Sequence, residues 1–207
     1  EVEVTADCSW TVNPSFGSMA GPTLTAARRG GQTQVVATCS GVSGASDLTL
    51  NLGGSIIAGT ATPAGAPTIF DTAMPASDPA RAPSLVYPLE GAIAPRNLPP
   101  IDVQWLAGQN DLFRVGLTAT NLDVDIYTSD ISVMLSEVDW GGIATTAAGE
   151  DLRIEVEGLL QAEPGAKFLG APVTFRISND VLDKTAIYWW ASSLGSLITQ
   201  TFGNTTA

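Results

Sequence analysis

The sequence has no histidine, only two cysteines and only two lysines. Catalytic triads that use histidine as the base are therefore excluded, and so are metal sites built on imidazole. Two cysteines are too few for a four-thiolate zinc site. The nucleophile motifs Ser-x-x-Lys and Gly-x-Ser-x-Gly are also absent. We therefore predict that the chain is not an enzyme.

Long apolar runs are missing as well. No segment approaches the roughly 20 apolar residues that a membrane-spanning helix needs, so no direct membrane span is expected. Positive charge is scarce: 9 Lys and Arg face 21 Asp and Glu, for a net charge of -12. Phosphate backbones and anionic lipids are bound mainly through Lys and Arg, so nucleic acid is not an expected partner.

What is abundant is small and apolar. Hydrophobic residues make up 44% of the chain and charged residues 14%, whereas about 25% is usual for charged residues. The hydrophobic share is enough for a packed core. Many Gly, Ala, Ser and Thr residues fill the remainder, a composition common in secreted β proteins. The chain begins within a strand-like pattern and ends just after a strand-like segment, from which we predict a mature, trimmed or excised fragment.

The first segment reads as a half-buried strand, because residues 2–12 alternate between apolar and polar side chains. Further strands are predicted over 24–26, 33–40 and 47–52, with glycine-rich turns between them. The two cysteines, Cys8 and Cys39, both lie in segments with a strand-like sequence pattern, and we predict that they form a disulfide. Trp10 follows Cys8 closely, which suits a sandwich core where an inter-sheet disulfide packs against an indole.

Three stretches of this first part resemble the bacterial immunoglobulin-like domains of group 2, found in intimin- and invasin-like surface proteins. They are VTADCSWTV, GGQTQVVATCSG and SDLTLNL. The resemblance covers about residues 2–52 and implies an immunoglobulin-like sandwich. Family members carry further strands before the first of these stretches, and this chain lacks them. The first unit is then incomplete, or another segment supplies its missing edge.

Residues 54–84 are rich in Pro, Ala, Gly and Thr and are predicted to form a linker. Within it, Ile69 and Phe70 are expected to tuck against a neighbouring element. A second unit starts at Leu85. Its strands are expected at the positions where apolar residues alternate with polar ones: 101–106, 112–117, 123–128, 131–134, 151–158, 173–178 and 186–191.

One short helix is expected within residues 136–148 of this second unit. Ser136 is the expected N-cap, with Asp139 three residues later. We expect Val138, Trp140 and Ile143 to be buried. A pair of glycines at positions 141 and 142 weakens the helix, so one or two turns are predicted.

The second unit resembles the domain that precedes the TolB-like β-propeller in large surface proteins of myxobacteria and related Deltaproteobacteria. The matching text is YPLEGAIAPRNLPPIDVQW, DLFRVGL, DWGGIATTAAGEDLRIEVEGL, PVTFRIS and AIYWW. The resemblance spans about residues 85–191. It implies an immunoglobulin-like sandwich in an exported, multidomain surface protein or lipoprotein, and it implies no catalytic residues.

Carboxylates offer one candidate site. Asp123, Asp125 and Asp130 follow one another in a strand and its turn, and calcium takes oxygen ligands of this kind. The spacing does not match an EF-hand loop, and solvation of an acidic sheet edge is the alternative interpretation.

Aromatic residues offer another candidate site. In the predicted strand of Tyr188, Trp189 and Trp190, successive side chains point to opposite faces, so at least one tryptophan faces a ligand, solvent or the next domain. Trp105 and Trp140 are in phase with buried positions and are expected in the core.

The sequence therefore predicts an all-β chain of two tandem immunoglobulin-like sandwiches. The expected parts are a partial sandwich over 1–53, the linker over 54–84, and a second sandwich over 85–207. We expect a structural or interaction module at the cell surface: a spacer, an adhesion segment or an assembly subunit, with strand donation between chains as one mode of assembly. Its expected partners are other domains of the same chain or other copies. The alternative is a carbohydrate-binding module that stacks glycans on exposed aromatic side chains.

Overall fold

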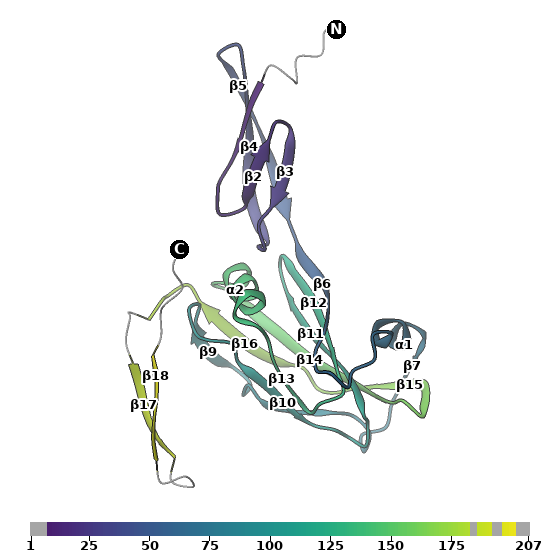
Figure 1. Cartoon of the computed structure of the whole chain (residues 1–207). Helices are drawn as coiled ribbons and strands as arrows, with labels where there is room; N and C mark the ends of the chain where they lie inside the picture. Colours follow the sequence, from purple (N-terminus) through teal and green to yellow (C-terminus); the bar gives the residue numbers. More distant parts are fainter. Residues whose placement is uncertain (1–7, 183–185, 192–195, 202–207) are drawn as a thin grey trace.

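The computed structural model describes residues 8–182 in full and the backbone of residues 186–191 and 196–201. The chain is mostly β, as expected, and forms two units (Figure 1). The N-terminal unit comprises residues 8–50 and projects from the second unit, which comprises residues 52–182 (Figure 1). The all-β prediction is confirmed at this level.

The N-terminal unit is a three-stranded antiparallel sheet with one hairpin beside it. The sheet has the order β1-β4-β5 and consists of β1 (Cys8–Val12), β4 (Gly31–Cys39) and β5 (Val42–Leu50). The hairpin pairs β2 (Gly17–Ala20) with β3 (Thr23–Ala26). A two-residue turn joins β4 to β5, with Ser40 at φ 50° and Gly41 at φ 82°. Positive φ at both positions is the geometry that two-residue hairpins favour.

The predicted disulfide between Cys8 and Cys39 is present. The two cysteines are direct register partners on the neighbouring strands β1 and β4, with Cα atoms 4.3 Å apart. Such a spacing is typical of directly opposed, non-hydrogen-bonded residues in an antiparallel pair. The bond therefore links two strands of one sheet. The expectation of an inter-sheet disulfide is wrong, because alternation alone does not tell which strands are neighbours.

The chain passes from one unit to the other with a single residue between strands. β5 ends at Leu50, and β6 (Leu52–Ile57) begins two positions later. β6 lies parallel to β12 (Leu122–Thr128) and forms one edge of the large sheet of the second unit.

The second unit is built on an eight-stranded sheet. Its main path is β6-β12-β11-β14-β15-β7, and β14 also pairs with β16, which pairs with β9. The central strands are antiparallel, whereas β6, β7 and β9 join the edges in parallel. The remaining strands are β7 (Met74–Ala76), β9 (Ala92–Pro95), β11 (Leu112–Ala119), β14 (Asp151–Leu160), β15 (Glu163–Leu169) and β16 (Val173–Ser178).

A smaller sheet and a helix cover one face of this large sheet. The smaller sheet has the order β13-β10-β8, from β8 (Ser84–Tyr87), β10 (Asp102–Leu106) and β13 (Ser132–Met134). The main hydrophobic core lies between these layers. Trp105 on β10 is 2% exposed and meets Phe113 on β11 edge-on, with ring centroids 5.4 Å apart. The prediction that Trp105 is a core residue is confirmed.

The expected helix is α2 (Glu137–Thr146), which caps the core beside the smaller sheet. The Oγ of Ser136 accepts a hydrogen bond from the Asp139 amide, so the predicted N-cap is confirmed. Trp140 and Ile143 are buried, but Val138 is 64% exposed. Its predicted burial is wrong. The buried positions 140, 143, 144 and 147 form one helical stripe, and position 138 lies on the opposite side.

The segment predicted as a linker is folded onto the second unit. After β6 it forms α1 (Ala66–Thr72), β7 and then β8, and so runs from one edge of the large sheet to the other. Phe70 on α1 is 1% exposed and packs against Tyr127 with ring centroids 5.6 Å apart, so the expected tucking of Phe70 is confirmed. The structure thus differs from a linker over 54–84. Prolines lie at helix starts, edges and turns here, where their missing N–H is tolerated.

The last strands form a separate hairpin. β17 (Ala186–Ala191) pairs antiparallel with β18 (Ser196–Thr201). The strand predicted over 186–191 is therefore present. The side chains of Tyr188, Trp189 and Trp190 lie outside the described residues, so the predicted aromatic contact stays a prediction.

Candidate functional site

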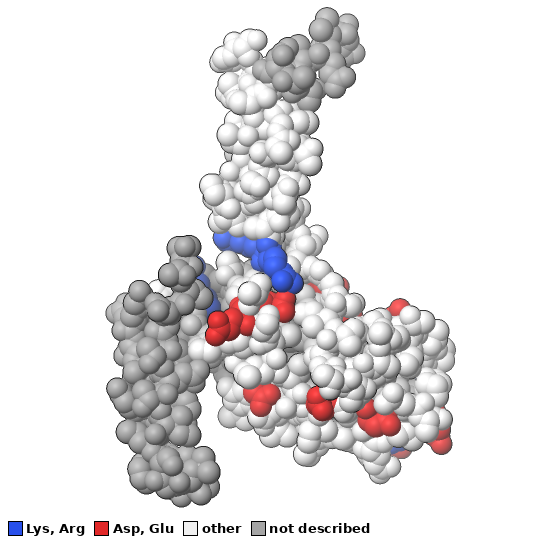
Figure 2. Space-filling model, viewed as in Figure 1, with Lys and Arg blue, Asp and Glu red and all other residues white. Residues whose placement is uncertain are grey.

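The joint between the two units is the first candidate site. The loop between β3 and β4 reaches α2, where an Arg28 guanidinium nitrogen lies 2.6 Å from a carboxylate oxygen of Asp139. The Oγ of Ser136 donates to the other oxygen of this carboxylate at 2.6 Å. Asp139 lies in the first turn of α2, where the helix dipole favours negative charge. Basic and acidic atoms lie side by side where the two units meet (Figure 2).

Close backbone contacts complete the joint. The Gly30 amide of the N-terminal unit donates to the Thr146 Oγ1 of α2 at 2.9 Å. A Cβ on Gly142 would lie 2.7 Å from the Arg28 carbonyl oxygen, whereas one on Gly141 would meet nothing within 4 Å. A side chain at Gly141 would thus have room, whereas the missing side chain at Gly142 permits the close approach of the Arg28 backbone to α2. The joint fixes the N-terminal unit through a hydrogen bond, an ion pair and a close backbone approach.

A small aromatic cluster stabilises the base of the N-terminal unit at this joint. Phe16 is 6% exposed, and the Arg29 guanidinium lies 4.4 Å from the centre of its ring. This distance is within the range of a cation–π contact. The backbone on either side of Arg29 is thereby held where Arg28 and Gly30 reach the second unit.

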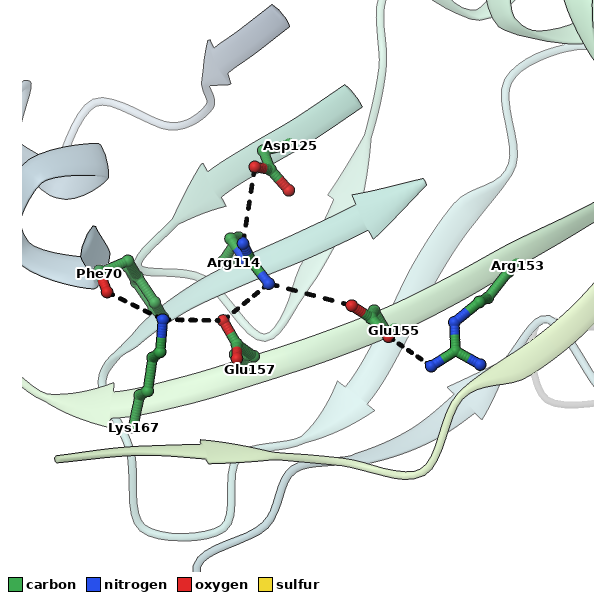
Figure 3. A network of polar contacts seen from close by, with 7 residues as sticks. All are labelled: Phe70, Arg114, Asp125, Arg153, Glu155, Glu157 and Lys167. Carbon is green, nitrogen blue, oxygen red and sulfur yellow. Dashed lines mark hydrogen bonds and ion pairs between the residues drawn. The ribbon is translucent and has the colours of Figure 1, made fainter. Parts of the chain in front are cut away.

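A charged network on the large sheet is the second candidate site. It lies on the face opposite the main core, called here the open face, and Figure 3 shows its members. Arg114 on β11 is central, with guanidinium nitrogens 2.9 Å from Glu157 and 3.7 Å from Asp125. Arg114 also lies 3.9 Å from Glu155. Arg153 pairs with the same Glu155 at 2.6 Å.

The network extends to α1 through Lys167 on β15. Its ammonium donates to the Phe70 carbonyl at 3.0 Å and lies 3.9 Å from Glu157 (Figure 3). Glu157 is only 8% exposed, although sequence alternation places it on the outward face. Buried carboxylates need compensating positive charge. Arg114 and Lys167 provide it here, and Lys167 also attaches α1 to the sheet through the Phe70 carbonyl.

Burial raises the pKa of two groups beside this network. Desolvation raises the pKa of Asp125, and the nearby Asp123 and Glu155 add to the rise, while Arg114 opposes it. Desolvation also raises the pKa of Tyr127, and the Asp125 carboxylate adds to that rise. The uncharged forms of both groups are favoured relative to free side chains.

The carboxylates predicted as a calcium site are placed differently. Asp123 and Asp125 are on the open face of β12, and Asp125 faces Arg114. Asp130 lies in the next turn, beside Gly59. Among residues 8–182, no group of three or more acidic, histidine or cysteine side chains is arranged to hold a metal ion. Asp125 therefore faces Arg114, Asp123 lies opposite Thr118, and Asp130 lies at the Gly59 turn.

Trp105 and Trp140 both lie in the core, as their phase with buried positions predicted. Trp105 is buried, and Trp140 is 4% exposed with its indole N–H donating to the Leu98 carbonyl at 2.9 Å. Neither ring is available to stack on a sugar.

No helix in the described part of the chain is long and apolar enough to cross a membrane.

Most residues of the joint and the charged network are not identifiable from sequence alone. Arg114 lies within an apolar strand, and two of its carboxylate partners, Glu155 and Glu157, come from β14, far along the chain. Alternation could place Arg153 and Glu155 on the outward face. The register that brings them together could not be predicted from the alternation.

No protein-family model, curated protein or solved structure matches the chain.

Proposed function

We propose that this chain is a structural module of an exported surface protein, in which it acts as a spacer, adhesion segment or assembly subunit. The joint is the observation that carries the proposal. β5 of the N-terminal unit continues into β6 of the second unit with only Asn51 between them. The contacts of Arg28 and Gly30 with α2 hold this connection in place. A unit braced at its base projects in a fixed direction, which is what a spacer requires.

The strand order supports the finer proposal that the second unit is an immunoglobulin-like sandwich. Such sandwiches place strands A, B and E in one sheet and strands C′, C, F and G in the other. Here β8, β10 and β13 have the order of A, B and E, and β12, β11, β14 and β16 have the order of C′, C, F and G. In this assignment β6 lies outside C′, and β9 lies beside G.

The resemblances of the two units stay part of the same proposal. A partial group 2 immunoglobulin-like unit followed by the domain that precedes TolB-like propellers fits a multidomain surface protein. The disulfide between Cys8 and Cys39 is compatible with this location, because disulfides persist in oxidising compartments. Other domains of the same protein or other copies are the proposed partners.

Two measurements test the proposal. In the source cells, a membrane-impermeant amine reagent should label the protein on intact cells as fully as on lysed cells. Labelling only after lysis would reject the surface location. Small-angle X-ray scattering of the intact chain should fit a single extended particle with both units in the arrangement of Figure 1. Scattering that requires an ensemble of inter-unit angles would reject the spacer role.

A further inference from the structure

β6 is an outer strand, and its second edge is paired with no other strand that the structure describes. On its inner side, the Leu52 amide donates to the Asn121 carbonyl and the Ala58 amide donates to the Tyr127 carbonyl. The N–H and C=O of one strand residue point to the same side, and the side alternates along the strand. The backbone groups of Gly53, Ser55 and Ile57 therefore point away from β12, and within the described chain no residue bonds to them.

This edge lacks the features that usually keep sheet edges apart. Natural edges carry lysine, proline, bulges or inward-pointing charges. The sequence of β6 is LGGSII, and its register with β12 is continuous over its whole length, with Gly54 at a φ of 146°. Gly53, Gly54 and Ser55 are exposed, and Ile57 is 40% exposed. The strand thus offers unblocked donors and acceptors.

Hollows lie on both faces of this edge. One, of about 150 Å³, lies between β6 and α2; Leu52, Ile56 and Ile143 form its apolar lining, and the ion pair of Arg28 and Asp139 lies at its side. A methyl group added at Gly54 would meet nothing within 4 Å. The other hollow lies on the open face and is lined mostly by backbone and polar side chains. An added strand with alternating side chains would fill the first hollow with its apolar residues.

We propose that β6 pairs antiparallel with β6 of a second copy across a twofold axis at Ser55. Ser55 then lies opposite the partner's Ser55, and Gly53 lies opposite the partner's Ile57. These are the residues whose backbone groups point outward, so each opposed pair exchanges two hydrogen bonds. The two large sheets become one continuous sheet, and the interface is closed and symmetric.

The side chains of β6 match this register. With Ser55 on the axis, both isoleucines of the strand face glycines: Ile57 lies across Gly53 of the other copy, and Ile56 lies across Gly54. Ile56 of the second copy thereby comes next to the hollow beside α2 of the first. The glycines leave room on both faces for the isoleucines, so β6 is complementary to itself.

The pairing of β6 specifies how copies would assemble, and it rests on the proposed assembly role. Sedimentation velocity measures the association of copies, whereas scattering of the monomer measures the rigidity of each copy. A monomeric but rigid chain would reject the pairing of β6 and leave the spacer role standing.

Sedimentation velocity of the intact chain tests the pairing. We expect a monomer–dimer equilibrium that Ser55→Pro weakens at least about tenfold, because the two central hydrogen bonds are lost. The Ser55 amide points away from β12, so proline there spares the bonds within the sheet. Ser55→Thr keeps the amide and should dimerise like the unaltered chain. A chain that stays monomeric up to about 1 mM overturns the proposal, as does an open-ended series of oligomers.

Cross-linking fixes the register even if Ser55→Pro fails to fold. Both native cysteines are in the disulfide, so an introduced cysteine is the only free thiol. Opposed hydrogen-bonded residues have Cα atoms about 5.5 Å apart, within reach of a disulfide. Ser55→Cys should give a covalent dimer on mild oxidation, and a mixture of Gly53→Cys and Ile57→Cys chains should give a mixed dimer.

The control is Ala45→Cys, which places an exposed thiol on β5 away from this edge. It should cross-link far less than Ser55→Cys under the same oxidation. Equal yields for the two variants overturn the pairing. A dimer of Ser55→Cys without the mixed dimer of the other two chains overturns the twofold register.

Discussion

The two units of this chain are both β structures, yet they are stabilised in different ways. Among residues 8–50, Phe16 is the only hydrophobic side chain that is fully buried, and a disulfide cross-links the sheet at its far end. The second unit has a large continuous core between two sheets and α2. The N-terminal unit therefore depends on its disulfide and its contacts with the second unit, whereas the second unit folds around its own apolar interior.

Truncation of one tryptophan in each unit should give the largest contrast. Trp105→Ala empties a fully buried site, so the second unit should lose about 3–5 kcal/mol of unfolding free energy. Trp10 is only half-buried in the N-terminal unit, so Trp10→Ala should cost clearly less. Urea denaturation followed by tryptophan fluorescence and circular dichroism measures both. Equal losses would contradict the difference between the units.

Removal of the disulfide should affect one unit alone. The bond closes a loop with a sequence separation of 31, for which chain-entropy estimates give about 3–4 kcal/mol. The variant Cys8→Ser with Cys39→Ser should therefore expose β4 and β5 to fast amide exchange, while β11 and β14 stay protected. Hydrogen-exchange mass spectrometry resolves these strands. Faster exchange throughout the second unit would show that its core is not self-sufficient.

The glycine pair of α2 provides a matched test of the joint. Gly142→Ala places a methyl group against the Arg28 carbonyl, and such overpacking costs about 1–3 kcal/mol. Gly141→Ala meets open space, so it should stabilise the helix by up to about 1 kcal/mol. Thermal unfolding of the two variants should shift in opposite directions. A shift in the same direction for both would mean that the approach of Arg28 is not tight.

Protonation of Asp125 should have the smallest effect. Its folded pKa is raised above 3.8 by burial, so its protonated form favours the folded state. This contribution is present below pH 3.8 and is lost as the pH rises through the folded pKa. Asp125→Asn should therefore stabilise the chain at pH 7, by less than about 1 kcal/mol, and should have little effect at pH 3.

The control for that prediction is Asp123→Asn, which changes an exposed carboxylate on the same strand. Its thermal unfolding should stay within about 0.5 kcal/mol of the unaltered chain at both pH values. If Asp125→Asn were destabilising at pH 7, the attraction to Arg114 would outweigh the cost of burial.

Local signals explain what could be predicted from the sequence. The strand at 173–178 was placed by alternation with its exact bounds, and α2 was placed by its N-cap at Ser136. The core position of Trp105 followed from its phase with Ile101 and Val103. In each of these cases the information lies within about ten residues of sequence, because side-chain periodicity and capping are local properties.

The rest depends on contacts between distant residues. α1 was missed because its burial comes from Tyr127, Leu112 and Leu159 on other elements. β15 was missed because Pro164 and Gly165 interrupt its alternation, and its partners on β14 and β7 fix it instead. Arg28 and Arg114 have no local signal at all. The strand register shows which carboxylates Arg114 meets, and the docking of the β3–β4 loop on α2 shows which one Arg28 meets.

The distance between the two units tests the central claim of a braced joint most directly. Spin labels at Ala45→Cys and Gln104→Cys occupy exposed positions of the N-terminal and second units. Dilution with unlabelled chain suppresses distances between copies. Double electron–electron resonance should then give one narrow distance distribution, which broadens when Gly142→Ala is added. A broad distribution in the unaltered joint would contradict a fixed projection of the N-terminal unit.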